Sequence, residues 1–269
     1  MIRVGPAGPG GLSYIKALEG ISCLGLSAME VEFTYGVKMT NGAAKEIGKL
    51  ADRLDISLSV HAPYYINLSS KEKNKIRDSK KRIIDSCERA HYLGARYVVF
   101  HAGFYQARSA EETYKIIKKG IEELLAIIRR NEWKVVLAPE VSGKRAQFGS
   151  LEEVLRLRKE TGSEFCVDFA HLEAREGKKV DFKDIFDKLK GIKHIHSHLA
   201  GIEYTEKGEK RHLLTKNSSI ASLVKEIVKR GVDITIINES LDPVGDSIKA
   251  YKLIKSFTKN SNVTFKTLS

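Results

Sequence analysis

The sequence has little cysteine and no long hydrophobic run. Its three cysteines, Cys23, Cys87 and Cys166, are odd in number, widely spaced and without a CxxC pair, which excludes a disulfide scaffold and favours a reducing compartment. No stretch approaches the roughly 18 consecutive apolar residues of a membrane span, so an integral membrane protein is not predicted. The first residues, MIRVGPAGPGG, lack the apolar core of a secretory signal. A cytoplasmic protein is therefore expected.

Acidic residues are also in the minority. The 269 residues contain 34 Asp and Glu against 46 Lys and Arg, which gives a formal net charge of +12. Such a charge suits a polyanionic partner, because each phosphate that a basic side chain contacts releases condensed counterions. The lysines are spread over predicted helix surfaces such as 71–82, and an ordinary solvated surface has the same pattern. The charge therefore favours a nucleic-acid partner without establishing one.

The chain repeats a short β-branched run, a loop and an amphipathic helical pattern. The clearest helical pattern spans 110–130, where apolar residues recur with the 3.6-residue period of a helix. It begins with Ser109-x-x-Glu112, and the next helical pattern begins with Ser150-x-x-Glu153; both have the spacing of a capping box. The candidate strands are 2–4, 29–33, 57–61, 97–101, 135–140, 164–168, 194–198 and 234–239.

A strand followed by a helix, repeated eight times, predicts a closed α/β barrel. We expect a single (β/α)₈ TIM-barrel domain over residues 1–269. The alternative is an open, doubly wound sheet, which normally has a glycine-rich phosphate turn after its first strand. The stretch PAGPGG at 6–11 contains two prolines and has the wrong glycine spacing for that turn. The sequence therefore favours the barrel.

Metal-binding residue types stand at the C-terminal ends of successive predicted strands. In a barrel these ends meet at one mouth, so we expect the side chains to be neighbours. Burying these side chains together without partners would cost free energy, and a divalent cation bound through nitrogen and oxygen removes that cost. The number of ligands exceeds the need of one ion, which favours a cluster of Zn²⁺ with Mn²⁺ as the alternative. The strand-end residues are His61, His101, Glu140, Asp168, His198 and Glu239, and His171 follows Asp168 closely.

The seventh predicted strand carries three histidines, His194, His196 and His198, at alternate positions. Alternate residues of a regular strand face the same way, but only the one nearest the mouth can reach the metals. We therefore predict His198 as the ligand, with His196 as the alternative, and interior positions for the others.

The segment beyond the seventh strand, 201–214, adds Glu209 and His212. These two side chains can join His171 around a third ion. Without such an ion, the segment has the composition of a charged, solvated lid.

Seven stretches, in order along the predicted strands, resemble the endonuclease IV family of apurinic/apyrimidinic endonucleases (family 2), which are xylose-isomerase-like TIM barrels. The resemblance runs from about His61 to Pro243, most of the chain. The matching stretches are VHAPYYINL (60–68), VFHAG (99–103), PEVSGK (139–144), VDFAH (167–171), HLAGIEY (198–204), GEKRH (208–212) and NESLDP (238–243).

The resemblance implies a cluster of three zinc ions. Glu140 would bridge the first and second ions. The other implied ligands are His61 and His101 for the first ion, Asp168, His198 and Glu239 for the second, and His171 and His212 for the third. In the family the third ion also takes an aspartate two residues before its last histidine; here Lys210 stands there, and Glu209 beside it is the candidate replacement.

The resemblance also implies an activity. The expected function is hydrolysis of the phosphodiester 5′ to abasic sites in damaged DNA, as in base excision repair, by hydroxide generated at the ions that Glu140 links. Tyr64 and Asn67 match family positions near the substrate phosphate. The expected partner is DNA containing abasic sites, and neither a membrane nor an obligate protein partner is inferred.

Two other functions remain open from the residues. The first is a sugar isomerase or epimerase, in which a single metal has four ligands that resemble Glu140, Asp168, His198 and Glu239. It leaves His61, His101 and His171 without metal roles, so the number of bound ions distinguishes it from the nuclease. The second is a basic barrel that binds nucleic acid without cleaving it, which only Lys210 favours.

Overall fold

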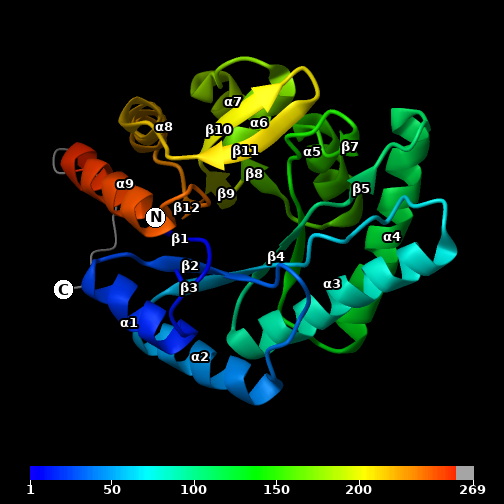
Figure 1. The fold of residues 1–269 in the computed structure, drawn as a ribbon, viewed down its shortest axis with the longest axis horizontal. Coiled ribbons are helices and arrows are strands. Elements are labelled where there is room, and N and C mark those ends of the chain that lie inside the picture. The colour runs from blue at the N-terminus through cyan, green and yellow to red at the C-terminus, as the bar shows by residue number, and fades with distance from the viewer. Residues whose placement is uncertain (259–269) are drawn as a thin grey trace.

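The chain folds into a barrel of parallel strands surrounded by helices, in a computed structural model that describes residues 1–258 (Figure 1). The strands are short, β-branched and almost fully buried, since each faces the barrel interior on one side and a helix on the other. The barrel strands of the described residues are β1 (Ile2–Pro6), β2 (Ala28–Glu32), β3 (Ser57–His61), β4 (Tyr97–Phe100), β6 (Val136–Pro139), β8 (Cys166–Asp168), β9 (Ile195–Leu199) and β12 (Ile234–Asn238).

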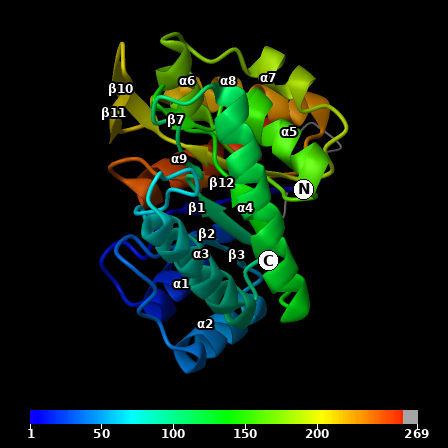
Figure 2. The ribbon, with the colours of Figure 1, turned by 90° about the vertical axis from the view of Figure 1, so that its right-hand side faces the viewer.

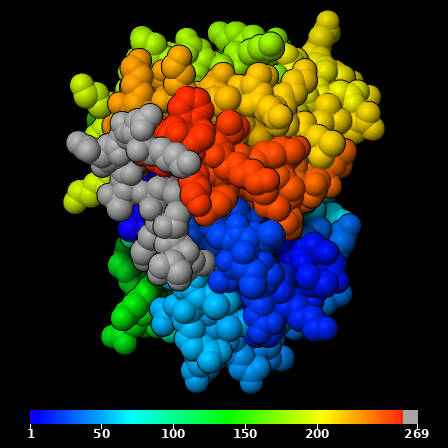
Figure 3. Space-filling model, turned by 90° about the vertical axis from the view of Figure 1, so that its left-hand side faces the viewer, coloured from blue at the N-terminus to red at the C-terminus, as the bar shows by residue number. Residues whose placement is uncertain are grey.

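The eight barrel strands of the described residues form two four-stranded parallel sheets that join into a ring. Their orders are β1-β12-β9-β8 and β2-β3-β4-β6. Single parallel bridges, Ala7 to Glu30 and Glu140 to Cys166, connect the two sheets. Figure 3 shows the blue N-terminal segments beside the red C-terminal helix, as ring closure requires. The predicted TIM barrel is confirmed, although 259–269 of the predicted domain lie outside the described residues.

Helices cover the outside of the ring, and the predicted capping boxes are present. Ser109 Oγ accepts from the Glu112 N–H at 3.2 Å while Glu112 Oε2 accepts from the Ser109 N–H at 2.9 Å. Ser150 and Glu153 form the same pair of bonds, and such a cap contributes about 1 kcal/mol. The helices are α1 (Tyr14–Cys23), α2 (Asn41–Arg53), α3 (Lys73–Leu93), α4 (Ala110–Arg130), α5 (Leu151–Thr161), α6 (Phe169–Glu176), α7 (Phe182–Lys188), α8 (Asn217–Arg230) and α9 (Pro243–Thr258).

Two antiparallel strand pairs lie outside the ring. One pairs β5 (Gly103–Phe104) with β7 (Gln147–Phe148), and the other is a hairpin of β10 (Gly201–Thr205) and β11 (Gly208–Leu213). Figure 2 shows this hairpin at one edge of the molecule. The segment 201–214, which has the composition of a charged, solvated lid, forms this hairpin because it pairs with itself across a short turn. Among the described residues, no helix combines the length and apolar character needed to cross a bilayer.

Candidate metal centre

Glu140 stands at the centre of the barrel mouth, directly after β6, and is only 1% exposed. Its Oε2 atom lies 3.1 Å from His61 Nε2 and 3.3 Å from His101 Nε2. Its Oε1 atom lies 3.1 Å from His171 Nδ1 and 3.2 Å from His198 Nδ1. One carboxylate therefore joins side chains delivered by β3, β4, β9 and the start of α6, as convergence of parallel strand ends requires.

The strand-end residues form three overlapping sets around Glu140. In each set the ligand atoms lie within 4.8 Å of one another. Asp168 belongs to two of the sets, and as the N-cap of α6 its Oδ1 accepts from the His171 N–H at 2.7 Å. The structure thus brings together the residues that the resemblance assigns to each ion. The sets are His61, His101 and Glu140; Glu140, Asp168, His198 and Glu239; and Asp168, His171 and His212.

Backbone carbonyls orient three of these imidazoles. His61 Nδ1 lies 2.8 Å from the Ala62 carbonyl, His171 Nδ1 lies 3.0 Å from the Val141 carbonyl, and His212 Nδ1 lies 2.9 Å from the Glu239 carbonyl. A carbonyl only accepts, so each Nδ1 carries the proton in the neutral ring. Nε2 then carries the lone pair. It faces Glu140 in His61, and the Nε2 atoms of His171 and His212 face each other at 3.4 Å, which is the arrangement of imidazoles ready to bind a metal.

A β-bulge in the hairpin determines which side chain lies beside the third set, that of Asp168, His171 and His212. Tyr204 pairs with Glu209, and Glu203 pairs with Arg211, so Lys210 is an extra residue in β11. Lys210 Nζ is bonded to Glu203 at 2.5 Å, away from the centre. Glu209 Oε2 instead lies 3.4 Å from His171 Nε2. The bulge therefore places the Glu209 carboxylate, and not the Lys210 ammonium, beside His171.

Gly143 makes room for this arrangement in the loop after β6. A Cβ atom at this position would lie 2.8 Å from Glu209 Cβ and 2.9 Å from His171 Cδ2. The Gly143 carbonyl also accepts from the Glu209 N–H at 3.1 Å. The hairpin is thus fixed against the PEVSGK segment, and any side chain larger than hydrogen here would push Glu209 and His171 aside.

The buried charges at the mouth shift one another's pKa. Burial disfavours the charged imidazole, but the hydrogen bond to Glu140 and the charge of Glu32 raise the pKa of His61 to about 10. Burial would likewise raise the pKa of Glu140, but the surrounding histidines, with His101 first, hold it well below its usual range. Burial lowers the pKa of His101 to about 4. The centre therefore favours an ionised carboxylate, and a cation there would compete with protons for the imidazoles.

The residues present fit a divalent metal. Asp168 Oδ2 and His101 Nδ1 are buried and have no hydrogen-bond partner among the described residues. Asp168 Oδ2 lies 3.3 Å from His171 Nδ1, so a protonated imidazole is its charge partner, and a cation would take over that role. The donors are nitrogen and oxygen in mixed sets of three and four, which suits Zn²⁺ or Mn²⁺.

The two residues expected near a substrate phosphate lie apart. Tyr64 is 59% exposed and lines a pocket of about 290 Å³ that also contains His61, His101 and His171. Asn67 does not line this pocket; its Oδ1 accepts from the Ser69 N–H at 3.2 Å and so shapes the loop after β3. Tyr64 therefore lines the pocket, whereas Asn67 shapes the loop beside it.

Sequence reasoning missed two glutamates of β2. Glu30 is fully buried below the mouth, and Glu32 lines the pocket with an unpartnered Oε1. Burial raises the pKa of Glu32 to about 8, against the opposing charge of His61. The signal was present in AMEVE, because acids alternating with apolar residues in a strand buried on both sides must point into the barrel.

Comparisons with known proteins agree with the fold. Residues 18–257 match the family described as xylose isomerase-like TIM barrel. Uncharacterized protein MJ0133 of Methanocaldococcus jannaschii is 37% identical over 237 residues, which make up 84% of this chain and 86% of that protein. A probable endonuclease 4 of Mycoplasmopsis agalactiae is 32% identical over 90 residues, only 34% of this chain and 31% of that protein.

Solved structures with two different activities in their names share the architecture. Endonuclease IV from Thermus thermophilus has a TM-score of 0.68 at 18% identity, covering 96% of this chain and 100% of that chain. A D-tagatose 3-epimerase-like protein has a TM-score of 0.70 at 19% identity, covering 96% of this chain and 97% of that chain. At such identities the likeness shows the fold alone, so the choice of reaction depends on the chemistry of the mouth.

Proposed function

This chain belongs to the xylose isomerase-like TIM-barrel family, and within that family we propose that it is a zinc-dependent endonuclease acting on abasic sites in DNA. The observation that carries the proposal is the arrangement of three ligand sets around Glu140. A single-metal isomerase needs only the set that contains Glu239. It would leave four converging histidines without a role as metal ligands: His61, His101, His171 and His212. A multinuclear centre uses all of them.

The chain's own residues suggest how the reaction would be organised. Metals held here would supply an activated water and would neutralise the charge that develops on a phosphate. Glu140 keeps two of the ligand sets together, since its two oxygens face opposite groups of imidazoles. Tyr64 presents its hydroxyl at the pocket edge, where it can donate a hydrogen bond to a phosphate oxygen. Partial burial and the charge of Glu32 raise the pKa of Tyr64 to about 12, so it stays a donor at neutral pH.

The dimensions and the surface charge fit the proposed substrate. A pocket of about 290 Å³ is at the small end of ligand sites, which suits one sugar–phosphate unit better than a stacked base pair. An abasic nucleotide has no base to unpair, so rotating it out of the duplex costs less than rotating an intact one. The net charge of +12 supports attraction to DNA, and the three unpaired cysteines are compatible with the cytoplasm, where we place the protein.

A nicking assay tests this function. A duplex with a single abasic site should be cut on its 5′ side by the zinc-loaded protein, and a chelator should abolish the cut. An intact duplex of the same sequence is the control. If the zinc-loaded protein leaves the abasic strand whole, the proposed function is wrong. Binding of a single ion, together with epimerisation of a ketose, would identify the alternative function that the epimerase-like structures represent.

Glu209→Gln and Lys210→Gln form a matched pair that tests the third ligand set. Glu209, unlike Lys210, faces His171. Glu209→Gln should therefore weaken the binding of one zinc ion by about 10- to 100-fold and lower the zinc-to-protein ratio after dialysis. Lys210 is bonded to Glu203 on the outer side, so its change should leave the ratio unaltered. Elemental analysis of the two variants at equal free zinc makes the comparison; equal metal contents would exclude Glu209 as a ligand.

A further inference from the structure

Glu30 lies one layer below the ligand sets, inside the barrel. It belongs to β2 and is fully buried. Its Oε2 atom accepts from Ser59 Oγ at 2.6 Å and lies 3.1 Å from His196 Nε2, so side chains of β3 and β9 hold that oxygen in place. Its Oε1 atom lies 2.9 Å from His198 Nε2. The carboxylate is thus anchored by one oxygen and presents the other to His198.

His198 differs from the other imidazoles of the centre in how it is turned. It faces the ligand sets with Nδ1, which lies 3.2 Å from both Glu140 Oε1 and Glu239 Oε1. Its outer nitrogen, Nε2, has no backbone carbonyl as partner, and neither this nitrogen nor Glu30 Oε1 makes a hydrogen bond within residues 1–258. The two buried atoms instead form an ion pair at 2.9 Å.

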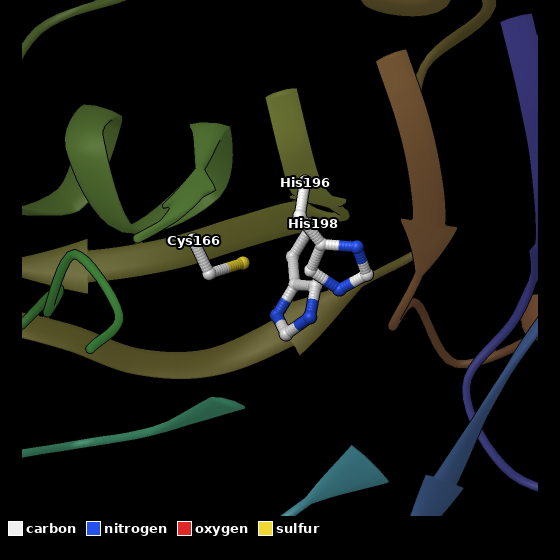
Figure 4. A group of neighbouring side chains, drawn as sticks. All are labelled: Cys166, His196 and His198. Atoms are coloured by element: carbon white, nitrogen blue, oxygen red, sulfur yellow. The ribbon is translucent and has the colours of Figure 1, made fainter. Parts of the chain in front are cut away.

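A rival interpretation places a metal inside the barrel, because Cys166 also lies beside these histidines. Figure 4 shows its sulfur pointing toward the imidazoles of His196 and His198. Two observations oppose a metal there. His196 is stacked on Tyr97, with ring centroids 4.8 Å apart, and its Nε2 is already paired with Glu30. His198 Nδ1 faces the mouth.

We propose that Glu30 is a positioning residue that orients His198 for the second ligand set. A carboxylate on the outer nitrogen of a metal-binding imidazole fixes the ring and makes its inner nitrogen a better donor. The inference rests on the proposed metal centre and deepens it. Because Glu30 contacts only one of the centre's histidines at the mouth, its effect should be confined to one ion.

Zinc titration of Glu30→Gln against a competing chelator tests the proposal. The variant should bind one zinc ion about 10- to 100-fold more weakly than the unmodified protein, and its remaining zinc should keep its affinity. Ser59→Ala is the matched control, since Ser59 contacts only the anchored oxygen; it should change no affinity more than about threefold. The melting temperatures of all proteins in excess chelator show whether the fold is intact. Should Glu30→Gln fail to fold, Glu30→Asp, which withdraws the carboxylate by one methylene, is titrated with the same expectation.

The outcomes separate the inference from the proposed function. Unchanged zinc affinities in a folded Glu30 variant would overturn the positioning role while leaving the metal centre in place. Equal losses in Glu30→Gln and Ser59→Ala would also overturn it, because they would indicate general loosening of the interior. Loss of the same ion in Cys166→Ser would overturn it as well, since the interior group would then bind the metal itself. If the unmodified protein binds no zinc, the proposed function fails first.

Discussion

Replacing Glu140 by glutamine is expected to lower the rate of abasic-site cleavage by on the order of 10³-fold or more. The amide has the same shape but no negative charge. It would therefore leave His61, His101 and His198 without the carboxylate that their inner nitrogens approach at 3.1–3.3 Å. Affinity for DNA should stay within a few fold, because Glu140 is 1% exposed and cannot contact a duplex backbone directly.

The measurement compares single-turnover nicking, DNA binding and zinc content of this variant. Glu122→Gln is the matched control, because Glu122 lies on the exposed side of α4 and pairs only loosely with Lys118 at 3.9 Å. The control should cleave at the rate of the unmodified protein. If Glu140→Gln cleaves at the rate of the unmodified protein, the Glu140 carboxylate is not required for the reaction.

Removal of the metals is expected to destabilise the whole protein. The mouth gathers Glu32, Glu140, Asp168, Glu209 and Glu239 in a small space, and without cations their charges are offset by the histidines and by protonation, as the raised pKa of Glu32 indicates. A ligand at about 1,000 times its Kd stabilises the folded state by about 4 kcal/mol. For a chain of this size that corresponds to a fall in Tm of about 10 °C for each ion withdrawn.

Thermal unfolding with excess chelator, and again after zinc is restored, measures this effect. The Tm should fall with the chelator and recover with zinc, and elemental analysis should give two to three ions for each chain. Magnesium in place of zinc is the control, since it binds nitrogen ligands poorly. A Tm that does not respond to the chelator would mean that no ion contributes to the folded state.

The barrel and most of the candidate centre could be predicted because each strand and the residue at its end can be recognised from a short stretch of sequence. The predicted strand 57–61 coincides with β3, and its last residue, His61, lies at the mouth. Alternation along the predicted strand 194–198 allowed a choice among its three histidines, and His198 is the one that contacts Glu140. The chemistry of such residues follows from the topology, since parallel strands all end on the same side.

Other features could not be predicted, because they depend on register and on packing between distant segments. The position of Lys210 in a bulge follows from how β10 pairs with β11, and spacing along the sequence does not reveal it. The role of Asn67 in its own loop depends on Ser69. Glu30 is different, since the alternation in AMEVE already indicated an interior position once a closed barrel was predicted.

The hairpin has a consequence for how such a protein can change. Glu209 and His212 belong to a surface ribbon, and none of the eight described barrel strands depends on its pairing. One inserted or deleted residue in β11 would exchange the side chain presented to His171 while the barrel interior stayed as it is. In the proposed centre, variation in this ribbon would therefore change the ligands of the third ion while the pairing of the barrel strands stayed the same.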